Sequence, residues 1–193
     1  MTEARRTPPP SPRRSGRAAA LAAVVAALAV APAAAAGAPG VRGAIVAAAQ
    51  REIGRPFRGD CSGFVLSLLA RAGVRVALPA ARSRSESLYL ASQRVAAPRP
   101  GDLAFFHDTY DRNRDGRAND PYTHVALVEA VLGREVLLVH RSGRGIERVR
   151  MDLSRPADPD ANDPVRLPRV SDPRGTRFLA GELFAGYGAL VAR

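Results

Sequence analysis

The chain has 193 residues, 46% of them hydrophobic, which is enough for one domain with a sizeable core and excludes a wholly disordered protein. Its formal net charge is +11, but all 29 basic residues are arginine. These arginines are scattered rather than gathered into a stripe interleaved with aromatic residues, so a nucleic-acid partner is not predicted. The exclusive use of arginine, with abundant alanine, glycine and proline, is typical of a GC-rich genome.

Residues 1–36 have the three parts of a secretory signal peptide. Five arginines up to Arg17 precede an apolar run over residues 18–31, and three alanines at 34–36 supply a cleavage site before Gly37. The run is short for a membrane span and Pro32 follows it, so we expect cleavage and no stable membrane anchor afterwards. The predicted mature chain is a single domain over 37–193, exported to the periplasm, cell wall or exterior of a bacterium.

Three helices are predicted in the first half of this domain. The first covers residues 41–53 and is stopped by the Gly-Arg-Pro sequence at 54–56. The second begins at Cys61, with Asp60 as its N-cap, and continues through mostly apolar residues to 72. The third covers residues 83–95, with Ser83 or Ser85 as its cap.

Strands are predicted in the second half, over residues 102–106, 124–128, 136–140 and 146–153, with a short helix or a last strand within 178–191. The short connections between the last three of the four strands indicate antiparallel pairing. Helices followed by a run of strands predict an α+β fold, with the N-terminal helices packed on an antiparallel sheet of about five strands. Residues 107–121 form a polar loop, and residues 155–176, with five prolines and several aspartates, form a surface excursion.

Cys61 is the only cysteine of the chain and opens the second predicted helix. Unpaired N–H groups and the helix dipole at this position lower the pKa of a thiol and favour the nucleophilic thiolate. A small buried hydrophobe is the alternative interpretation, but it gives no reason for Asp60 before the cysteine and Ser62-Gly63 after it. We therefore predict that Cys61 is reactive, provided that the chain supplies a base.

The three histidines are His107, His124 and His140. His124 begins one predicted strand and His140 ends the next, so a hairpin closed at Gly133-Arg134 brings the two side chains together. A thiol nucleophile needs a base and a group that orients the base, which makes His124 the candidate base and His140 the candidate orienting residue. His107 is predicted to be a surface residue.

Four motifs follow one another in the chain: Asp-Cys-Ser-Gly-Phe at a helix start, Pro-Gly-Asp-Leu-x-Phe-Phe on a strand, Thr-His-Val at a strand start, and a histidine on the next strand. They lie at residues 60–64, 100–106, 123–125 and 140, and their order resembles the NlpC family of papain-like cell-wall cysteine peptidases. The resemblance covers residues 41–153. It implies a papain-like fold that hydrolyses amide bonds in peptidoglycan stem peptides, with Cys61 as nucleophile, His124 as base and His140 as orienting residue.

The same resemblance implies that no cofactor is required, that peptidoglycan is the partner, and that backbone N–H groups beside Ser62 form an oxyanion hole. Asp60, Ser62, Phe57 and Arg58 are the candidate substrate contacts. Phe57 departs from the family pattern, because the family has a tyrosine and a longer glycine-rich segment before the cysteine. Two alternatives stay open: an N-acetylmuramoyl-L-alanine amidase of the same fold, and a catalytically weak or inactive module that binds peptidoglycan.

The polar loop contains oxygen-bearing side chains at alternate positions before a glycine, which resembles the first half of an EF-hand calcium loop. The candidate ligands are Asp111, Asn113, Asp115, Arg117 through its carbonyl, and Asp120. The twelfth position, where that loop has glutamate, is Tyr122. A solvated turn rich in Asp, Asn and Gly is the alternative, so structural calcium is a prediction to be tested by melting with calcium and with chelator.

Overall fold

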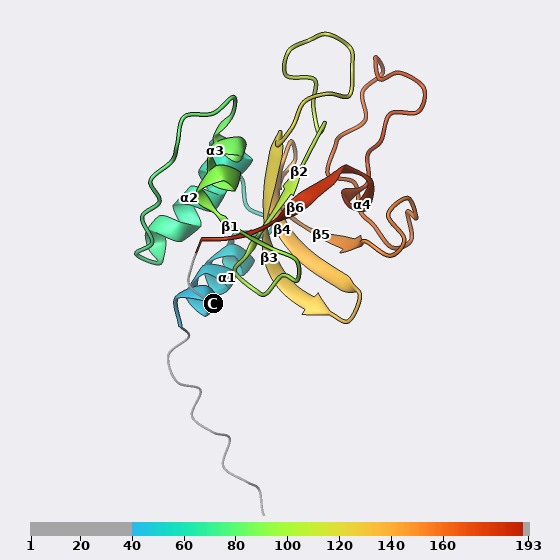
Figure 1. Ribbon diagram of the computed structural model, residues 1–193. Coiled ribbons are helices and arrows are strands. Elements are labelled where there is room, and N and C mark those ends of the chain that lie inside the picture. Colours follow the sequence, from blue (N-terminus) through green and yellow to red (C-terminus); the bar gives the residue numbers. More distant parts are fainter. Residues whose placement is uncertain (1–39, 191–193) are drawn as a thin grey trace, which may run out of the picture. The chain divides into compact units, whose positions relative to one another are not determined.

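The computed structural model of the chain describes residues 40–190, and the predicted signal peptide lies outside them (Figure 1). Four helices occur in this range: α1 (Val41–Glu52), α2 (Cys61–Arg71), α3 (Arg84–Ala91) and the short α4 (Ala180–Leu183). None of the helices in the described range is long and apolar enough to cross a membrane.

Six strands form one antiparallel sheet: β1 (Gln93–Val95), β2 (Leu103–Phe106), β3 (His124–Leu132), β4 (Glu135–Ser142), β5 (Gly145–Asp152) and β6 (Phe184–Ala189). Their order across the sheet is β1-β6-β2-β3-β4-β5. The last strand of the described chain therefore lies inside the sheet, between the first two, while β2 to β5 follow one another as neighbours. Residues 107–121 and 153–179 leave the sheet as two long excursions (Figure 1).

The central strands bury both of their faces, because successive side chains of a strand point to opposite sides of the sheet. Phe105 and Val125 pack with α1 and α2 on one face, in a core that includes the fully buried Phe64. Phe106 and Val128 belong to a second core on the other face, which the excursion after β5 and α4 complete, through Val165, Ala180 and Leu183 among others. Burying a side chain as large as Phe64 stabilises the fold by roughly 3 kcal/mol.

One buried carboxylate ties the helical layer to the sheet. Glu129, at the irregularity in the β3–β4 pairing, accepts a hydrogen bond of 2.8 Å from Gln50 of α1 and a two-pronged ion pair from Arg148 of β5. Arg148 holds the pKa of the Glu129 carboxyl below its usual range. The charge is paired on both oxygens, which is the condition under which a buried carboxylate is tolerated.

The α+β class and the antiparallel sheet are confirmed, with three corrections. The sheet has six strands instead of about five. The third helix, predicted to reach residue 95, ends at Ala91, and the chain then forms β1 as an edge strand on β6. The tail contains both a short helix and a strand, where the sequence left the choice between them.

Candidate active site

Cys61 is the first residue of α2, and its side chain is partly exposed. Asp60 caps the helix, with its Oδ1 accepting the N–H of Gly63 at 2.6 Å. The sulfur lies 3.9 Å from the Oγ of Ser62 and 4.0 Å from the Oγ of Ser85, a buried residue of α3. The thiol therefore sits where the start of α2 meets the first turn of α3.

The surroundings of Cys61 favour the thiol over the thiolate that its position in the helix predicts. Burial raises its pKa above the ordinary value, and the negative charge of Asp60 acts in the same direction. Hydrogen bonds with the backbone of Val125 and with Ser62 and Ser85 oppose this rise without cancelling it. This direction is opposite to the lowering that the helix terminus predicts, and loss of water around the sulfur is its largest cause.

His124 and His140 lie together in the interior. His124 begins β3, His140 lies in β4, and the Nε2 of His124 is 2.8 Å from the Nδ1 of His140. The rings are nearly perpendicular, at 84°, and only 7% and 1% of the two residues is exposed. The hairpin thus brings the two side chains together, as the sequence predicts.

Burial keeps both imidazoles neutral. It lowers the pKa of His124 to about 4, against a smaller opposing effect from Asp60, and it lowers the pKa of His140 to about 3, helped by the neighbouring His124. Since the Nε2 of His124 is engaged with His140, its Nδ1 is the nitrogen left for a reacting group. The Nε2 of His140 is buried and has no hydrogen-bond partner in the described part of the chain.

The start of α2 faces the start of β3. The sulfur of Cys61 interacts with the backbone of Val125, directly after His124, and the charge of Asp60 acts on the imidazole of His124. No hydrogen bond joins the sulfur to either imidazole within residues 40–190. The structure therefore pairs the two histidines with each other and places Cys61 beside them with its thiol turned toward serine hydroxyls.

The other predicted contacts divide between core and surface. The ring of Phe57 packs edge-on against Phe64, with centroids 5.4 Å apart, and belongs to the helix–sheet core. Ser62 is buried beside the sulfur, whereas Arg58 and Asp60 are exposed. Of these residues, Ser62 and Asp60 adjoin Cys61, and Phe57 has mainly a packing role.

Two residues near the thiol escaped the sequence interpretation. The sequence offers Ser83 or Ser85 as the cap of α3; Ser83 is the cap, and Ser85 faces the sulfur. Tyr110, from the 107–121 loop, lies near enough to Cys61 and Asp60 for their charges to add to the burial that raises its pKa. A phenol hydroxyl thus reaches this region from a different segment than Phe57, and no local spacing in the sequence indicates it.

The candidate calcium loop is closed by its own hydrogen bonds. Asp111, Asn113 and Asp115 accept the N–H groups of Gly116, Asp115 and Arg117 at 2.8–3.0 Å. Asp120 is buried, and its carboxylate accepts the backbone N–H of Arg112 and forms an ion pair with the Arg112 guanidinium. Among residues 40–190 no group of three or more His, Cys, Asp or Glu is arranged to hold a metal ion, so calcium stays a prediction.

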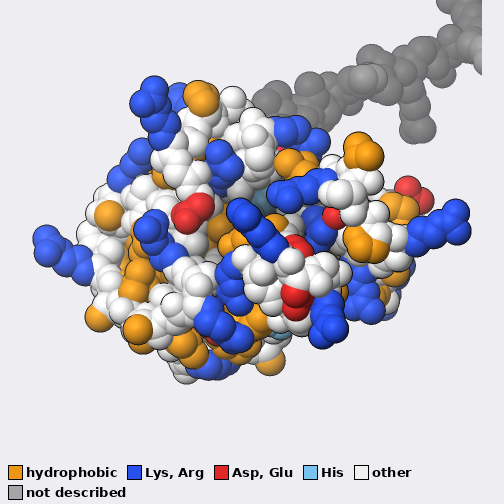
Figure 2. Space-filling model, turned by 90° about the horizontal axis from the view of Figure 1, so that it is seen from above, with side chains coloured by type: hydrophobic (Ala, Val, Ile, Leu, Met, Phe, Trp, Pro, Cys, Tyr) orange, Lys and Arg blue, Asp and Glu red, His pale blue; other side chains and the backbone are white. Residues whose placement is uncertain are grey.

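A cavity of about 570 Å³ lies between the 107–121 loop and residues 166–177. Five arginines line it, at 117, 166, 169, 174 and 177, together with Asp108, Asp111 and Asp172, and the three candidate catalytic residues are not among the lining. Figure 2 shows arginines spread over the upper face of the molecule among apolar and acidic side chains. No protein-family model matches the chain, and a search of curated proteins found no significant match.

Proposed function

We propose that the protein is an exported cysteine hydrolase of papain-like fold and NlpC type that cleaves amide bonds in peptidoglycan stem peptides. The observation that carries the proposal is the buried His124–His140 pair, 2.8 Å apart, beside a lone cysteine at the start of a helix. A base, a group that orients it and a nucleophile are the three parts that thiol-dependent acyl transfer requires. Peptidoglycan as the substrate rests on the resemblance of the four motifs.

The mechanism begins with a turn of the Cys61 side chain from the serine hydroxyls toward the Nδ1 of His124. His124 removes the thiol proton as the sulfur attacks the amide carbon, and its Nε2–H donates to the Nδ1 of His140. The same proton then passes to the leaving amine, and water hydrolyses the acyl-enzyme by the reverse route. Because the thiol pKa is raised and the imidazoles are neutral, proton removal accompanies attack rather than preceding it.

The first turn of α2 supplies hydrogen-bond donors for the developing oxyanion. The N–H groups of Gly63 and Phe64 already bond to the side chain and carbonyl of Asp60. Those of Cys61 and Ser62 have no partner within residues 40–190. Two such N–H groups beside the nucleophile are the geometry that stabilises a tetrahedral intermediate, typically by 2–4 kcal/mol per donor.

A binding module without turnover is the second candidate, and the orientation of the thiol favours it. The sulfur has serine neighbours rather than an imidazole, and its pKa is raised rather than lowered. A protein of this kind would bind wall peptides at the same face and release no product.

Mass spectrometry of purified peptidoglycan, incubated with the wild type, Cys61→Ser and His124→Ala, tests these proposals. An endopeptidase shortens the stem peptides but leaves them attached to the glycan, whereas an amidase releases whole stems. We expect shortened stems with the wild type and none with either variant. Sedimentation with peptidoglycan but no new product would favour the binding module, and products from Cys61→Ser would end the cysteine mechanism.

A further inference from the structure

Tyr122, two residues before His124, has a backbone conformation that its side chain does not favour. Its φ is +49°, in the left-handed region that a bulky aromatic residue rarely adopts. Because β3 begins at His124, the conformation of Tyr122 sets the direction in which the chain enters the strand and so the position of the imidazole. Contacts from elsewhere in the molecule must hold such a residue in place.

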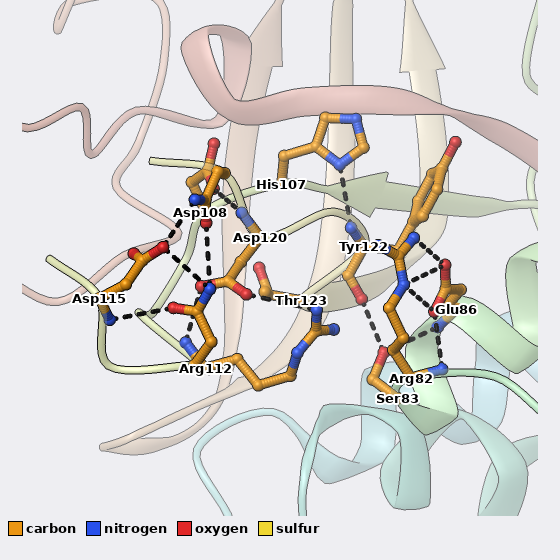
Figure 3. Close-up of polar contacts among 12 residues, drawn as sticks. Arg82, Ser83, Glu86, His107, Asp108, Arg112, Asp115, Asp120, Tyr122 and Thr123 are labelled. Atoms are coloured by element: carbon orange, nitrogen blue, oxygen red, sulfur yellow. Dashed lines mark hydrogen bonds and ion pairs between the residues drawn. The ribbon is translucent and has the colours of Figure 1, made fainter. Parts of the chain in front are cut away.

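Both backbone groups of Tyr122 are held by side chains from other segments (Figure 3). Its N–H donates to the Nδ1 of His107 at 2.9 Å, and its carbonyl accepts from the Oγ of Ser83 at 3.1 Å. Ser83 is itself fixed, because the same hydroxyl caps α3 by accepting the N–H of Glu86. The N-cap of α3 and the residue that follows β2 therefore each hold one of the two peptide groups that flank Tyr122.

The ring of Tyr122 is also enclosed. It stacks on Tyr89 with centroids 4.0 Å apart, and the ring of His107 meets it edge-on at 4.7 Å. The backbone of His107 is also held, because its N–H donates to the carbonyl of Leu183 in α4 at 2.9 Å. The next residue, Thr123, is held by Thr109, whose N–H donates to the Thr123 Oγ1 at 2.9 Å.

We propose that His107 is a positioning residue of the active site: its Nδ1, as a hydrogen-bond acceptor, holds Tyr122 in the left-handed conformation and thereby holds the imidazole of His124 toward Cys61. The inference rests on the proposed function, since it assigns His107 to the same reaction. His107 was predicted to be a surface residue, and its side chain is half-buried. An acceptor is required because the partner is a backbone N–H, so Nδ1 must carry no proton.

The surroundings of His107 keep this nitrogen unprotonated at neutral pH. Burial lowers the pKa of His107 below its ordinary value, and the charge of the adjacent Asp108 opposes this in part. The ring of His107 meets the phenol ring of Tyr122 edge-on, and its backbone N–H bonds to the Leu183 carbonyl of α4. The carboxylate of Glu182 in α4 is directed to the N–H groups of Phe178 and Leu179. Acid therefore breaks the hydrogen bond between the Tyr122 N–H and the Nδ1 of His107, because a protonated Nδ1 is a second donor facing that N–H.

Two substitutions of His107 separate positioning from simple packing. His107→Phe keeps an aromatic ring but removes the acceptor, and we expect kcat/KM on stem peptides to fall by about 10²-fold, mainly in kcat. His107→Asn places an amide oxygen near the position of Nδ1, so we expect activity within a few-fold of the wild type and the loss of one ionisation from the acid limb of the pH profile. Equal losses in both variants, with an unchanged pH profile, would overturn the proposal.

Nuclear magnetic resonance of the protein without substrate tests the hydrogen bond between Tyr122 and His107 independently of activity. We expect the ring of His107 in the Nε2–H tautomer, a slowly exchanging Tyr122 amide, and His124 ring signals that shift in His107→Phe but not in His107→Asn. A Nδ1–H tautomer, or His124 signals that ignore both substitutions, would refute the positioning role. If the wild type cleaves no peptide, the proposed function fails. The signals still show whether His107 positions His124 through Tyr122.

A glycine at position 122 provides an internal check. Tyr122→Gly adopts a positive φ at no steric cost, so its conformation depends less on the hydrogen bond that its N–H donates to the Nδ1 of His107. In this background His107→Phe should shift the His124 signals much less than it does alone. A shift of the same size in both backgrounds would contradict action through Tyr122.

Discussion

The neutrality of two imidazoles and one thiol governs what this site can do at rest. His124 and His140 are buried and Cys61 is partly buried, and burial moves the pKa of each toward the range in which the group is uncharged. A neutral thiol beside a neutral imidazole needs to lose its proton only when a substrate carbonyl arrives. The protein thereby keeps its cysteine as a thiol until a substrate binds, and a thiol is oxidised less readily than a thiolate.

Alkylation measures the protonation of Cys61 directly. We expect the rate with iodoacetamide to rise with pH around a midpoint above about 8.5, the value for an ordinary thiol, because the buried sulfur resists ionisation. Ser85→Ala removes a hydrogen bond that favours the thiolate, so its midpoint should lie higher still. Ser67→Ala, whose hydroxyl bonds to the Phe64 carbonyl in the same helix, is the matched control. A wild-type midpoint below 8 would indicate a thiolate–imidazolium pair instead.

At the scale of the elements, local patterns predicted the helices better than the edges of the sheet. The start of α2 was recognisable because Asp60 caps an apolar run, and the β3–β4 hairpin because branched residues flank a glycine turn. β1 was missed because its partner, β6, comes from the far end of the chain, so no local signal separates it from the end of α3. The left-handed conformation of Tyr122 was equally hidden, since its contacts with His107, Ser83 and Tyr89 join segments that are distant in the sequence.

The N-cap of α2 gives an element-scale prediction. Asp60→Ala removes the acceptor of the Gly63 N–H, and we expect the free energy of unfolding in urea to fall by about 1 kcal/mol. Asp60→Asn keeps a capping oxygen and should cost clearly less. Equal destabilisation by both substitutions would show that the charge of Asp60, rather than its cap, carries the effect.

The 107–121 loop gives a second prediction at this scale. If the aspartates and asparagine bind calcium, added calcium raises the melting temperature, chelator lowers it, and Asp115→Asn weakens the response. Asp160→Asn, an exposed aspartate of the other excursion, is the matched control and should leave the response unchanged. A melting temperature that ignores both calcium and chelator would refute this interpretation.

For the whole molecule, the buried histidines couple folding to pH. The pKa of His124 is about 4 in the folded protein and about 6.5 when unfolded, so the unfolded chain takes up the proton first as pH falls. This contribution to stability is complete above about pH 6.5 and is lost progressively toward pH 4, with His124 alone accounting for on the order of 3 kcal/mol.

Urea unfolding at pH 7 and pH 5 checks this expectation. We expect the wild type to be less stable at pH 5, and His140→Asn, which removes one of the two buried imidazoles, to lose less on acidification. The carboxylates contribute little in this window, since the pKa values of Glu129 and Asp163 are lowered by their arginine partners. Stability that stays constant from pH 7 to pH 5 would mean that water reaches the two rings.

The location of β6 also decides when the fold can be finished. Until residues 184–189 are in place, β2 offers an unpaired row of backbone groups and β1 has no neighbour at all. A chain made from its N-terminus must therefore reach residues 184–189 before the sheet can close. A product clipped before these residues would leave the edge of β2 open and would be prone to joining other copies edge to edge.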